Sequence, residues 1–238
     1  MKITLFTSNQ SRHIALANSL AEIADVVYCV NEVSTVHPGK VEGFYKKSEI
    51  FQNYFSNVLK SEKAIFGDIS FLKGNVMSLP VLMGDLNGID LPVLNQALDS
   101  DIYVVFGASW IKGDLIDFLI SKKAINIHMG ISPYYRGTAC NFWAAYDNNP
   151  EYIGATIHYL SKGLDSGPMV FHALPEAKIE DKFLTGMRSV KSAHLALKHL
   201  IKNEDVFNLK TEIQDKSKEI RYSKNSDFTD EIALDFMN

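Results

Sequence analysis

Residues 2–30 read KITLFTSNQSRHIALANSLAEIADVVYCV, and this stretch decides the fold. An apolar run at 2–7 precedes a polar turn, and the leucines of 12–23 then recur at helical spacing. A second apolar run follows at 26–30. Strand, short turn, helix and strand in this order are typical of a parallel sheet. We therefore predict an α/β, Rossmann-like fold: an open, mostly parallel sheet with helices on both faces.

The rest of the chain repeats the same two kinds of element. Short apolar runs bounded by glycine, proline or polar residues indicate strands, and apolar residues three and four positions apart indicate helices. Strands are predicted around Val81 and at 102–106, 124–128, 154–160 and 169–174, the last two as a hairpin-like pair; helices are predicted at 44–62, 92–98, 112–120, 139–146 and from 181 onward. Residues 130–138, rich in glycine and proline, are predicted to be a loop. We expect one domain over 1–205 and a short C-terminal extension, 206–238, packed on it.

Composition indicates an ordinary globular chain and excludes several classes. Its 238 residues are 46% hydrophobic and 22% charged, which allows a sizeable core. A net charge of −4 and a pI near 6.0 argue against a nucleic-acid-binding surface, which is usually basic. No apolar run reaches membrane-spanning length, and the N-terminus turns polar too soon for a signal peptide. Cys29 and Cys140 lack metal-site spacing, so we expect reduced thiols in a cytoplasmic protein.

Two polar residues, Asn126 and His128, end a predicted strand directly before the 130–138 loop. Residues two apart in a strand point to the same face, so the amide and the imidazole should project side by side. Asp165, in a later glycine-rich turn, can complete an acid/base set. A neutral donor, an imidazole and a carboxylate suit acyl transfer through a tetrahedral oxyanion. Taken singly, each residue also fits a polar strand end or an ordinary turn.

Four motifs in a fixed order make this pattern specific. They are Asn126-Ile127-His128, Pro133-Tyr134-Tyr135-Arg136-Gly137, Gly154-Ala155-Thr156-Ile157-His158 and Asp165-Ser166-Gly167. Together they resemble the folate-dependent formyltransferase family, which includes methionyl-tRNA formyltransferase, phosphoribosylglycinamide formyltransferase and the sugar N-formyltransferases. The close resemblance covers about 102–171. It implies that the 1–205 domain is catalytic, with 10-formyltetrahydrofolate as co-substrate and no metal.

The resemblance implies roles for the three polar residues. Asn126 and a protonated His128 would donate to the oxyanion that develops on the formyl group. Asp165 would support the histidine and help to move a proton from the attacking amine to the departing folate nitrogen. One oxyanion donor is worth ~3 kcal/mol, and acid/base help ~10²–10⁴-fold in rate. His158 is interpreted as structural, and His194, on a helical apolar stripe, as a core residue.

The resemblance also places a folate pocket between the loop after the central strand and the turn that carries the aspartate. Trp110 and Ile111 would form apolar walls for the pterin, and backbone groups would bind its amide-like edge. Burial in the core is the alternative for Trp110. The predicted folate contacts are Phe106, Gly107, Ser109, Trp110, Ile111, Ser161, Lys162 and Leu164.

The acceptor substrate is predicted to meet the first turn of the chain and the loop after His128. The first turn opens a helix and is a natural anion site, although it lacks the glycine-rich form of purine-pathway relatives. A plain helix cap is the alternative there. Aromatic residues at 134, 135, 142 and 143 either line a sugar or base pocket or pack their helix. The predicted acceptor contacts are Ser8, Asn9, Arg12, His13, Met129, Tyr134, Arg136 and Gly137.

The Tyr-Arg-Gly sequence and the aromatic helix resemble the sugar and tRNA branches more than the purine branch. An acidic chain with no room for the C-terminal barrel of the tRNA enzymes favours a small acceptor. We therefore predict a cytoplasmic sugar N-formyltransferase of surface-glycan biosynthesis, acting on a nucleotide-linked amino sugar, with no nucleic-acid or membrane partner and with a homodimer left open. The alternatives are another small amine such as glycinamide ribonucleotide, a formyl-folate hydrolase, and a folate-binding module without turnover.

Overall fold

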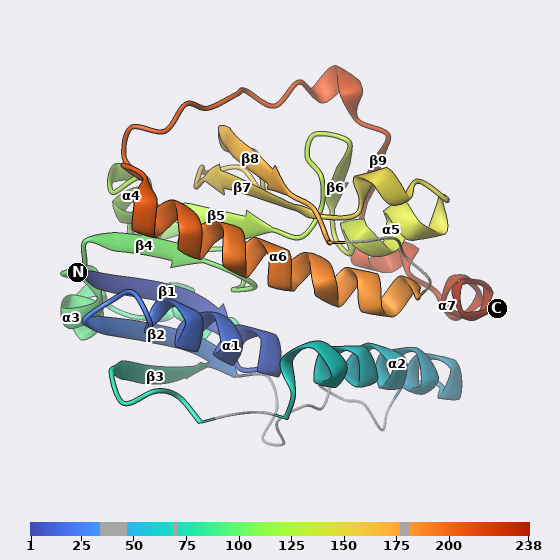
Figure 1. Ribbon diagram of the computed structural model, residues 1–238, viewed down its shortest axis with the longest axis horizontal. Helices are drawn as coiled ribbons and strands as arrows, with labels where there is room; N and C mark the ends of the chain where they lie inside the picture. The colour runs from blue at the N-terminus through green and yellow to red at the C-terminus, as the bar shows by residue number, and fades with distance from the viewer. Residues whose placement is uncertain (34–46, 69–70, 177–180) are drawn as a thin grey trace.

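A computed structural model describes residues 1–33, 47–68, 71–176 and 181–238. Its centre is an open sheet of seven strands in the order β3-β2-β1-β4-β5-β7-β8 (Figure 1). The first five strands in this order pair in parallel, whereas β7 pairs antiparallel with both β5 and β8. The strands are β1 (Lys2–Ser8), β2 (Val26–Val33), β3 (Val76–Leu82), β4 (Ile102–Val105), β5 (Ile125–His128), β7 (Ala155–Tyr159) and β8 (Met169–Ala173), and a separate two-stranded sheet joins β6 (Tyr135–Gly137) to β9 (Arg221–Ser223).

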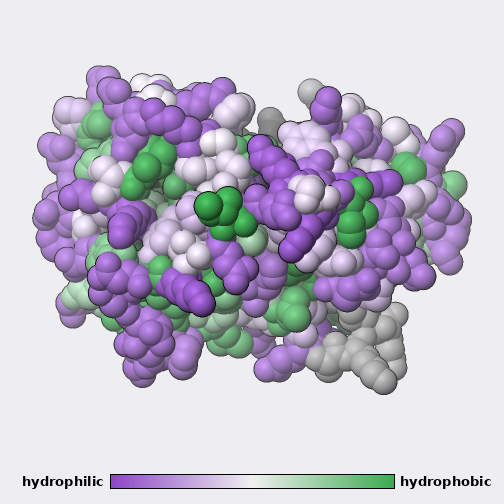
Figure 2. All heavy atoms as spheres, turned by 90° about the horizontal axis from the view of Figure 1, so that it is seen from above, coloured by the Kyte–Doolittle hydropathy of each residue, from purple (hydrophilic) through white to green (hydrophobic). Residues whose placement is uncertain are grey.

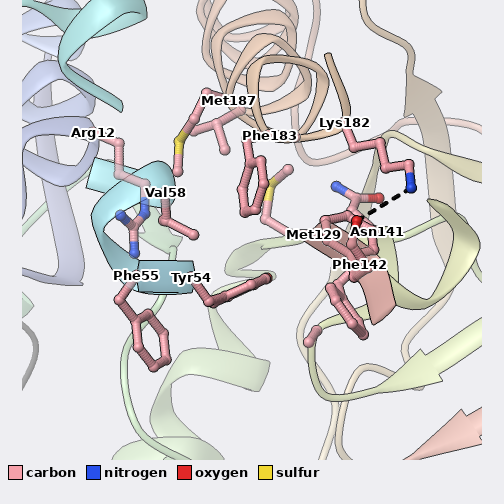
Figure 3. Close-up of a pocket in the computed structure, with 14 residues that line it drawn as sticks. Arg12, Tyr54, Phe55, Val58, Met129, Asn141, Phe142, Lys182, Phe183 and Met187 are labelled. Carbon is pink, nitrogen blue, oxygen red and sulfur yellow. Dashed lines mark hydrogen bonds between the residues drawn. The ribbon is translucent and has the colours of Figure 1, made fainter. Parts of the chain in front are cut away.

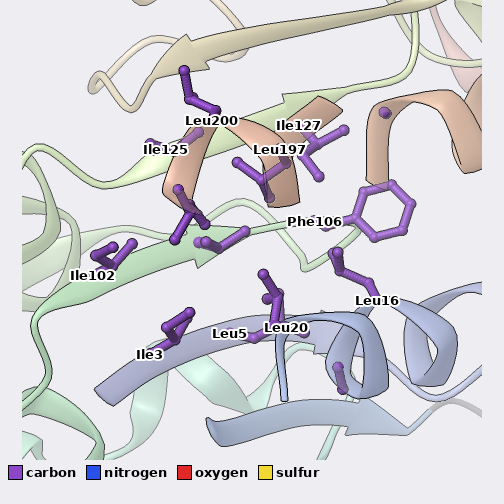
Figure 4. Close-up of a cluster of buried hydrophobic side chains, with 14 of the residues drawn as sticks. Ile3, Leu5, Leu16, Leu20, Ile102, Phe106, Ile125, Ile127, Leu197 and Leu200 are labelled. Carbon is purple, nitrogen blue, oxygen red and sulfur yellow. The ribbon is translucent and has the colours of Figure 1, made fainter. Parts of the chain in front are cut away.

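Helices cover both faces of this sheet, so the predicted fold class is confirmed (Figure 1). Side chains alternate between two buried clusters along the strands, as the two-residue period of a strand requires. Ile3 and Leu5 join the cluster beneath α1 and α6 (Figure 4), and Phe6 joins the cluster beneath α4. The helices are α1 (Ser11–Leu20), α2 (Glu49–Phe66), α3 (Asn95–Leu98), α4 (Gly113–Ser121), α5 (Cys140–Tyr146), α6 (Lys182–Asn203) and α7 (Asp230–Met237).

Two long helices that flank the site begin at capping residues. Ser48 precedes α2 and accepts the N–H of Phe51, and Asp181 precedes α6 and accepts two backbone N–H groups. Such caps satisfy donors that have no partner inside the helix. Of the predicted helix at 44–62, positions 44–46 lie outside the described residues. None of the helices in the described part of the chain is long and apolar enough to cross a membrane.

The structure corrects two predicted elements. The predicted loop at 130–138 contains the strand β6, because Tyr135–Gly137 pair with β9 more than eighty residues later in the chain. The predicted helix at 92–98 is a 3-10 turn, Leu91–Leu94, followed by the single turn α3. The strand predicted around Val81 is confirmed and is the longer β3.

The C-terminal residues 206–238 lie along the outside of the domain (Figure 1). They supply β9, an isolated bridge between Glu212 and Met169, and α7, which packs against α2. The division of the chain into a domain and an extension stays a prediction.

Candidate active site

The strand β5 presents Asn126 and His128 on one face of the sheet. Ile125 and Ile127 alternate with them and are buried in the cluster beneath α6. The two polar side chains therefore point to the opposite face, as the strand period predicts. Both are buried, with exposed fractions of 8% and 6%.

Asp165 closes this set from the turn between β7 and β8. Its backbone has a φ of 45°, in the left-handed region that non-glycine residues rarely adopt. Its Oδ2 lies 3.1 Å from Nδ1 of His128, and its Oδ1 accepts a hydrogen bond of 3.1 Å from Nδ2 of Asn126. The three predicted catalytic residues therefore form one hydrogen-bonded group.

His158 is a fourth member of this hydrogen-bonded group. The sequence analysis interpreted it as structural and did not predict this contact. The β5–β7 register sets it opposite Asn126, and opposed residues of an antiparallel pair share a face. Its Nδ1 donates to the Tyr159 carbonyl at 2.8 Å, so Nε2 accepts from Nδ2 of Asn126 at 2.9 Å. Both N–H bonds of the Asn126 amide are then in use, one on His158 and one on Asp165.

The opposite charges of His128 and Asp165 shift their pKa values in opposite directions. Burial opposes protonation of His128, but the Asp165 carboxylate outweighs it and raises the pKa of His128 well above 6.5. Burial alone would raise the pKa of Asp165, yet the imidazolium holds it far below its usual range. Both shifts favour the ion pair over the neutral pair. Nε2 of His128 has no hydrogen-bond partner among the described residues, although the Cys140 thiol lies near it.

A cavity of about 80 Å³ opens beside Asn126 and Asp165. Five of the eight predicted folate contacts line it. The other three lie elsewhere: the Phe106 ring packs on His13 and His194, a Cβ at Gly107 would come 2.6 Å from His13, and Lys162 pairs with Asp117. The lining residues are Val105, Ala108, Ser109, Trp110, Ile111, Ile116, Asn126, Leu160, Ser161, Gly163, Leu164 and Asp165.

A buried carboxylate holds the wall of this cavity. Glu32, at the end of β2, accepts the Ser109 backbone N–H and hydroxyl, each at 2.6 Å, and the Gly84 N–H at 3.0 Å. Its side chain therefore ties the loop after β4 to the loop after β3. The Trp110 ring is half exposed at the rim and carries the Lys112 ammonium 4.5 Å from its centre.

A larger cavity, of about 340 Å³, lies between α2, α5 and α6 (Figure 3). Met129, the residue after His128, lines it, as does Arg12 from the first turn; both are predicted acceptor contacts. Arg12 is paired with buried Glu62 at 3.0 Å, and Lys182 donates to the Phe236 carbonyl at 3.2 Å. The other lining residues are Tyr54, Phe55, Val58, Ala139, Asn141, Phe142, Phe183, Gly186, Met187, Val190 and Phe236.

The remaining predicted acceptor contacts lie outside both cavities. His13 is buried, and burial lowers its pKa well below the usual range. The Tyr134 ring packs at a tilt against the Tyr152 ring, with ring centres 4.6 Å apart. Arg136 pairs with Glu219 at 2.9 Å, and Gly137 approaches the Ser223 carbonyl, where a Cβ would come within 2.0 Å. Ser8 and Asn9, at the end of β1, do not line either cavity; acceptor binding by these six residues stays a prediction.

The predicted aromatic set divides in the same way. Phe142 lines the larger cavity, whereas Tyr135 and Trp143 are buried in packing, the latter beneath the Arg221 guanidinium. His194 is a core residue, as predicted, and burial lowers its pKa to about 3.

The stretch that carries this geometry matches a known family. Residues 94–200 match the formyl transferase family. Over 95 residues the chain is 34% identical to a methionyl-tRNA formyltransferase of Thermosynechococcus vestitus, a match that covers 40% of this chain but only 28% of that protein. The chain thus spans less than a third of the length of that relative.

Solved structures share the fold at low identity. A sugar N-formyltransferase from Shewanella sp. FDAARGOS_354 superposes with a TM-score of 0.56 at 17% identity, over 96% of this chain and 78% of that one. Glycinamide ribonucleotide transformylase 1 from Symbiobacterium toebii gives a TM-score of 0.56 at 13% identity, over 90% and 94%. Fold and site define a Rossmann-like protein with an Asn–His–Asp group at the carboxyl edge of its sheet. Residues 94–200 of the chain are similar to the formyl transferase family.

Proposed function

We propose that this protein transfers the formyl group of 10-formyltetrahydrofolate to the amine of a nucleotide-linked amino sugar. One observation carries the proposal: the hydrogen-bonded group stands next to two cavities. Asn126 and Asp165 line the smaller one, and Met129, which follows His128, lines the larger one. A two-substrate transfer needs this arrangement, because donor and acceptor must meet at the acid/base group.

The proposed chemistry follows from the unused donor. The neutral acceptor amine attacks the formyl carbon, and the carbonyl electrons move onto oxygen. The Nε2–H of the His128 imidazolium has no hydrogen-bond partner among the described residues, but it is buried beside Cys140 and His128 lines neither cavity. Its donation to the oxyanion therefore requires that substrate binding uncover it. The bond from carbon to the folate nitrogen then breaks. That nitrogen gains a proton and the amine loses one, with Asp165 and His128 as the carriers, so that a formamide and tetrahydrofolate remain.

In this proposal, Asn126 is the second candidate donor to the oxyanion. Its two N–H bonds point at His158 and Asp165, so it contributes to the oxyanion only after one of them is released. In the ground state its contribution is to orient the carboxylate. His128 therefore carries the larger share of oxyanion stabilisation.

The larger cavity supports a small acceptor. About 340 Å³ lies at the lower end of ligand pockets and suits a sugar ring with part of a nucleotide. Its aromatic walls offer stacking faces, and Lys182 and Arg12 each contribute a cation to its lining. A tRNA acceptor would need an extended basic surface for its phosphates, whereas the chain carries a net charge of −4.

The test supplies 10-formyltetrahydrofolate with a panel of acceptors: nucleotide-linked 3-amino and 4-amino sugars, glycinamide ribonucleotide and charged initiator tRNA. Mass spectrometry should show one formyl group added to an amino-sugar nucleotide. Efficient formylation of the tRNA with none of the sugars would replace the sugar assignment by the tRNA one. Formate release without any acceptor would indicate a hydrolase, and binding of folate without turnover would indicate a binding module.

Replacing Glu32 with glutamine is expected to weaken folate binding about tenfold or more. Glutamine offers one acceptor oxygen where three donors converge, and a lost hydrogen bond to a charged group is worth about 1.5–3 kcal/mol. Calorimetric titration with tetrahydrofolate measures the effect. Glu204→Gln, an exposed carboxylate at the end of α6, is the matched control. Equal affinities of the two variants would show that the clamp does not shape the folate cavity.

A further inference from the structure

Gln214 lies in the segment between α6 and β9, which runs along the outside of β7 and β8 (Figure 1). The face of the molecule on which this segment runs is largely polar, with apolar side chains only in scattered groups (Figure 2). The side chain of Gln214 is turned inward and is only 9% exposed. The neighbouring Ile213, an apolar residue, is 89% exposed. The polar residue is therefore buried and the apolar one is left in solvent, which reverses the usual preference.

Both N–H groups of the Gln214 amide are hydrogen-bonded to the turn that carries Asp165. Nε2 donates to the Asp165 carbonyl at 2.8 Å and to the Gly167 carbonyl at 2.9 Å. Its Oε1 is buried and has no hydrogen-bond partner within the described ranges. An unpaired buried acceptor disfavours folding. The oxygen has no partner because the amide is oriented so that both of its N–H groups reach the turn.

The turn needs such a restraint. Asp165 holds its left-handed backbone conformation without being a glycine. On the other side, Gly167 is pressed so close to β7 that a Cβ would come 1.8 Å from the Tyr159 carbonyl. The turn is therefore fixed between β7 and the Gln214 amide. Relaxation of Asp165 to negative φ would swing its carboxylate away from Nδ1 of His128.

We propose that Gln214 is a positioning residue, which holds the Asp165 carboxylate against His128 through the backbone of the turn. The C-terminal segment then completes the active site through the backbone of the turn. The predicted effect on rate rests on the proposed function; the predicted effect on geometry does not.

The test compares Gln214→Met with Ile213→Ala in the full chain. Methionine keeps the length and packing of glutamine but has no donors, and the alanine variant alters the same segment at an exposed site. The first readout is the NMR titration of His128, which reports the nearness of the Asp165 carboxylate whether or not the protein is a formyltransferase. Cys140, the other titratable group near this ring, is unchanged in both variants.

In Gln214→Met, the His128 titration should move to lower pH, because a distant carboxylate no longer favours the imidazolium. The second readout is formyl transfer: kcat should fall about 10–100-fold, as expected when a reacting group is displaced by about 1 Å. The pH above which kcat declines should also fall, and Ile213→Ala should match the wild type in each respect. If Gln214→Met does not fold, Gln214→Leu, which also has no donors and adds no charge, is read in the same way. A His128 titration identical to that of the control in a folded variant would overturn the proposal.

Discussion

His128→Ala is expected to lower kcat for formyl transfer by at least ~10²-fold, the smallest effect usual for a general acid or base. The imidazolium supplies the donor that no described residue uses, and alanine leaves the oxyanion without it. The folate and acceptor affinities should change little, since Asn126, Asp165 and Met129 still line the two cavities. Steady-state kinetics, with circular dichroism to confirm folding, measures the effect.

The companion variant Asp165→Asn should lose a similar factor and should also change the pH profile. Because Asp165 raises the pKa of His128 above 6.5, the wild-type histidine stays protonated below 6.5 and loses its proton only as the pH rises through the raised value. In Asp165→Asn the carboxylate is gone and burial dominates, so the pKa of His128 falls. The decline of kcat at alkaline pH must therefore begin at lower pH than in the wild type.

A histidine outside the site serves as the control. His199 is exposed on α6, and His199→Ala should keep wild-type kinetics. If the His128 and Asp165 variants both stayed within about threefold of wild type, the acid/base assignment would be wrong, since even the smallest expected effect is larger.

The pairing of Asn126 with His128 could be predicted because the signal is local. Asn126 and His128 are two apart in one strand, and the strand period alone places them on one face. The alternation of apolar runs and helical stripes fixed the fold class for the same reason. The Asp165 contact came from the family resemblance, since spacing in sequence does not show which turn reaches which strand.

The supporting residues could not be predicted because their partners are remote in sequence. Glu32 meets Ser109 at a separation of 77 residues, and Gln214 meets Asp165 at 49. His158 joins Asn126 only through the β5–β7 register, which no local pattern encodes. The strand β6 was hidden for the same reason, because its partner lies in the C-terminal segment.

The walls of the larger cavity illustrate a different limit. Helical stripes through α2 and α6 contain Tyr54 and Phe183, and such stripes usually mark core packing. Both residues do belong to an aromatic cluster, yet they also face the cavity (Figure 3). Hydrophobic periodicity identifies the buried side of a helix. Whether that side packs against protein or faces a cavity depends on how the other elements of the fold are placed around it.

Gly186 offers a direct test of that cavity, because it is a glycine within α6 on the cavity wall. A Cβ built there meets no atom within 4 Å, so larger side chains enter open space and not the core. Gly186→Trp should fill much of the cavity and raise the KM for the acceptor at least tenfold, which corresponds to about 1.4 kcal/mol of lost binding. The Kd for tetrahydrofolate should be unchanged, because the smaller cavity, which is proposed to bind folate, has no residue in common with this one.

Gly186→Ala is the matched control for the helix itself. Alanine should stabilise α6 by about 0.5–1 kcal/mol relative to glycine, seen as a higher Tm, while the acceptor KM stays close to wild type. An effect of the tryptophan on KM is then an effect of occupied volume and not of altered helix stability. Should the tryptophan variant fold and bind the acceptor with unchanged KM, the acceptor must bind elsewhere; the first turn at Ser8 and Asn9 would then be the next site to probe, because it lies at the same edge of the sheet.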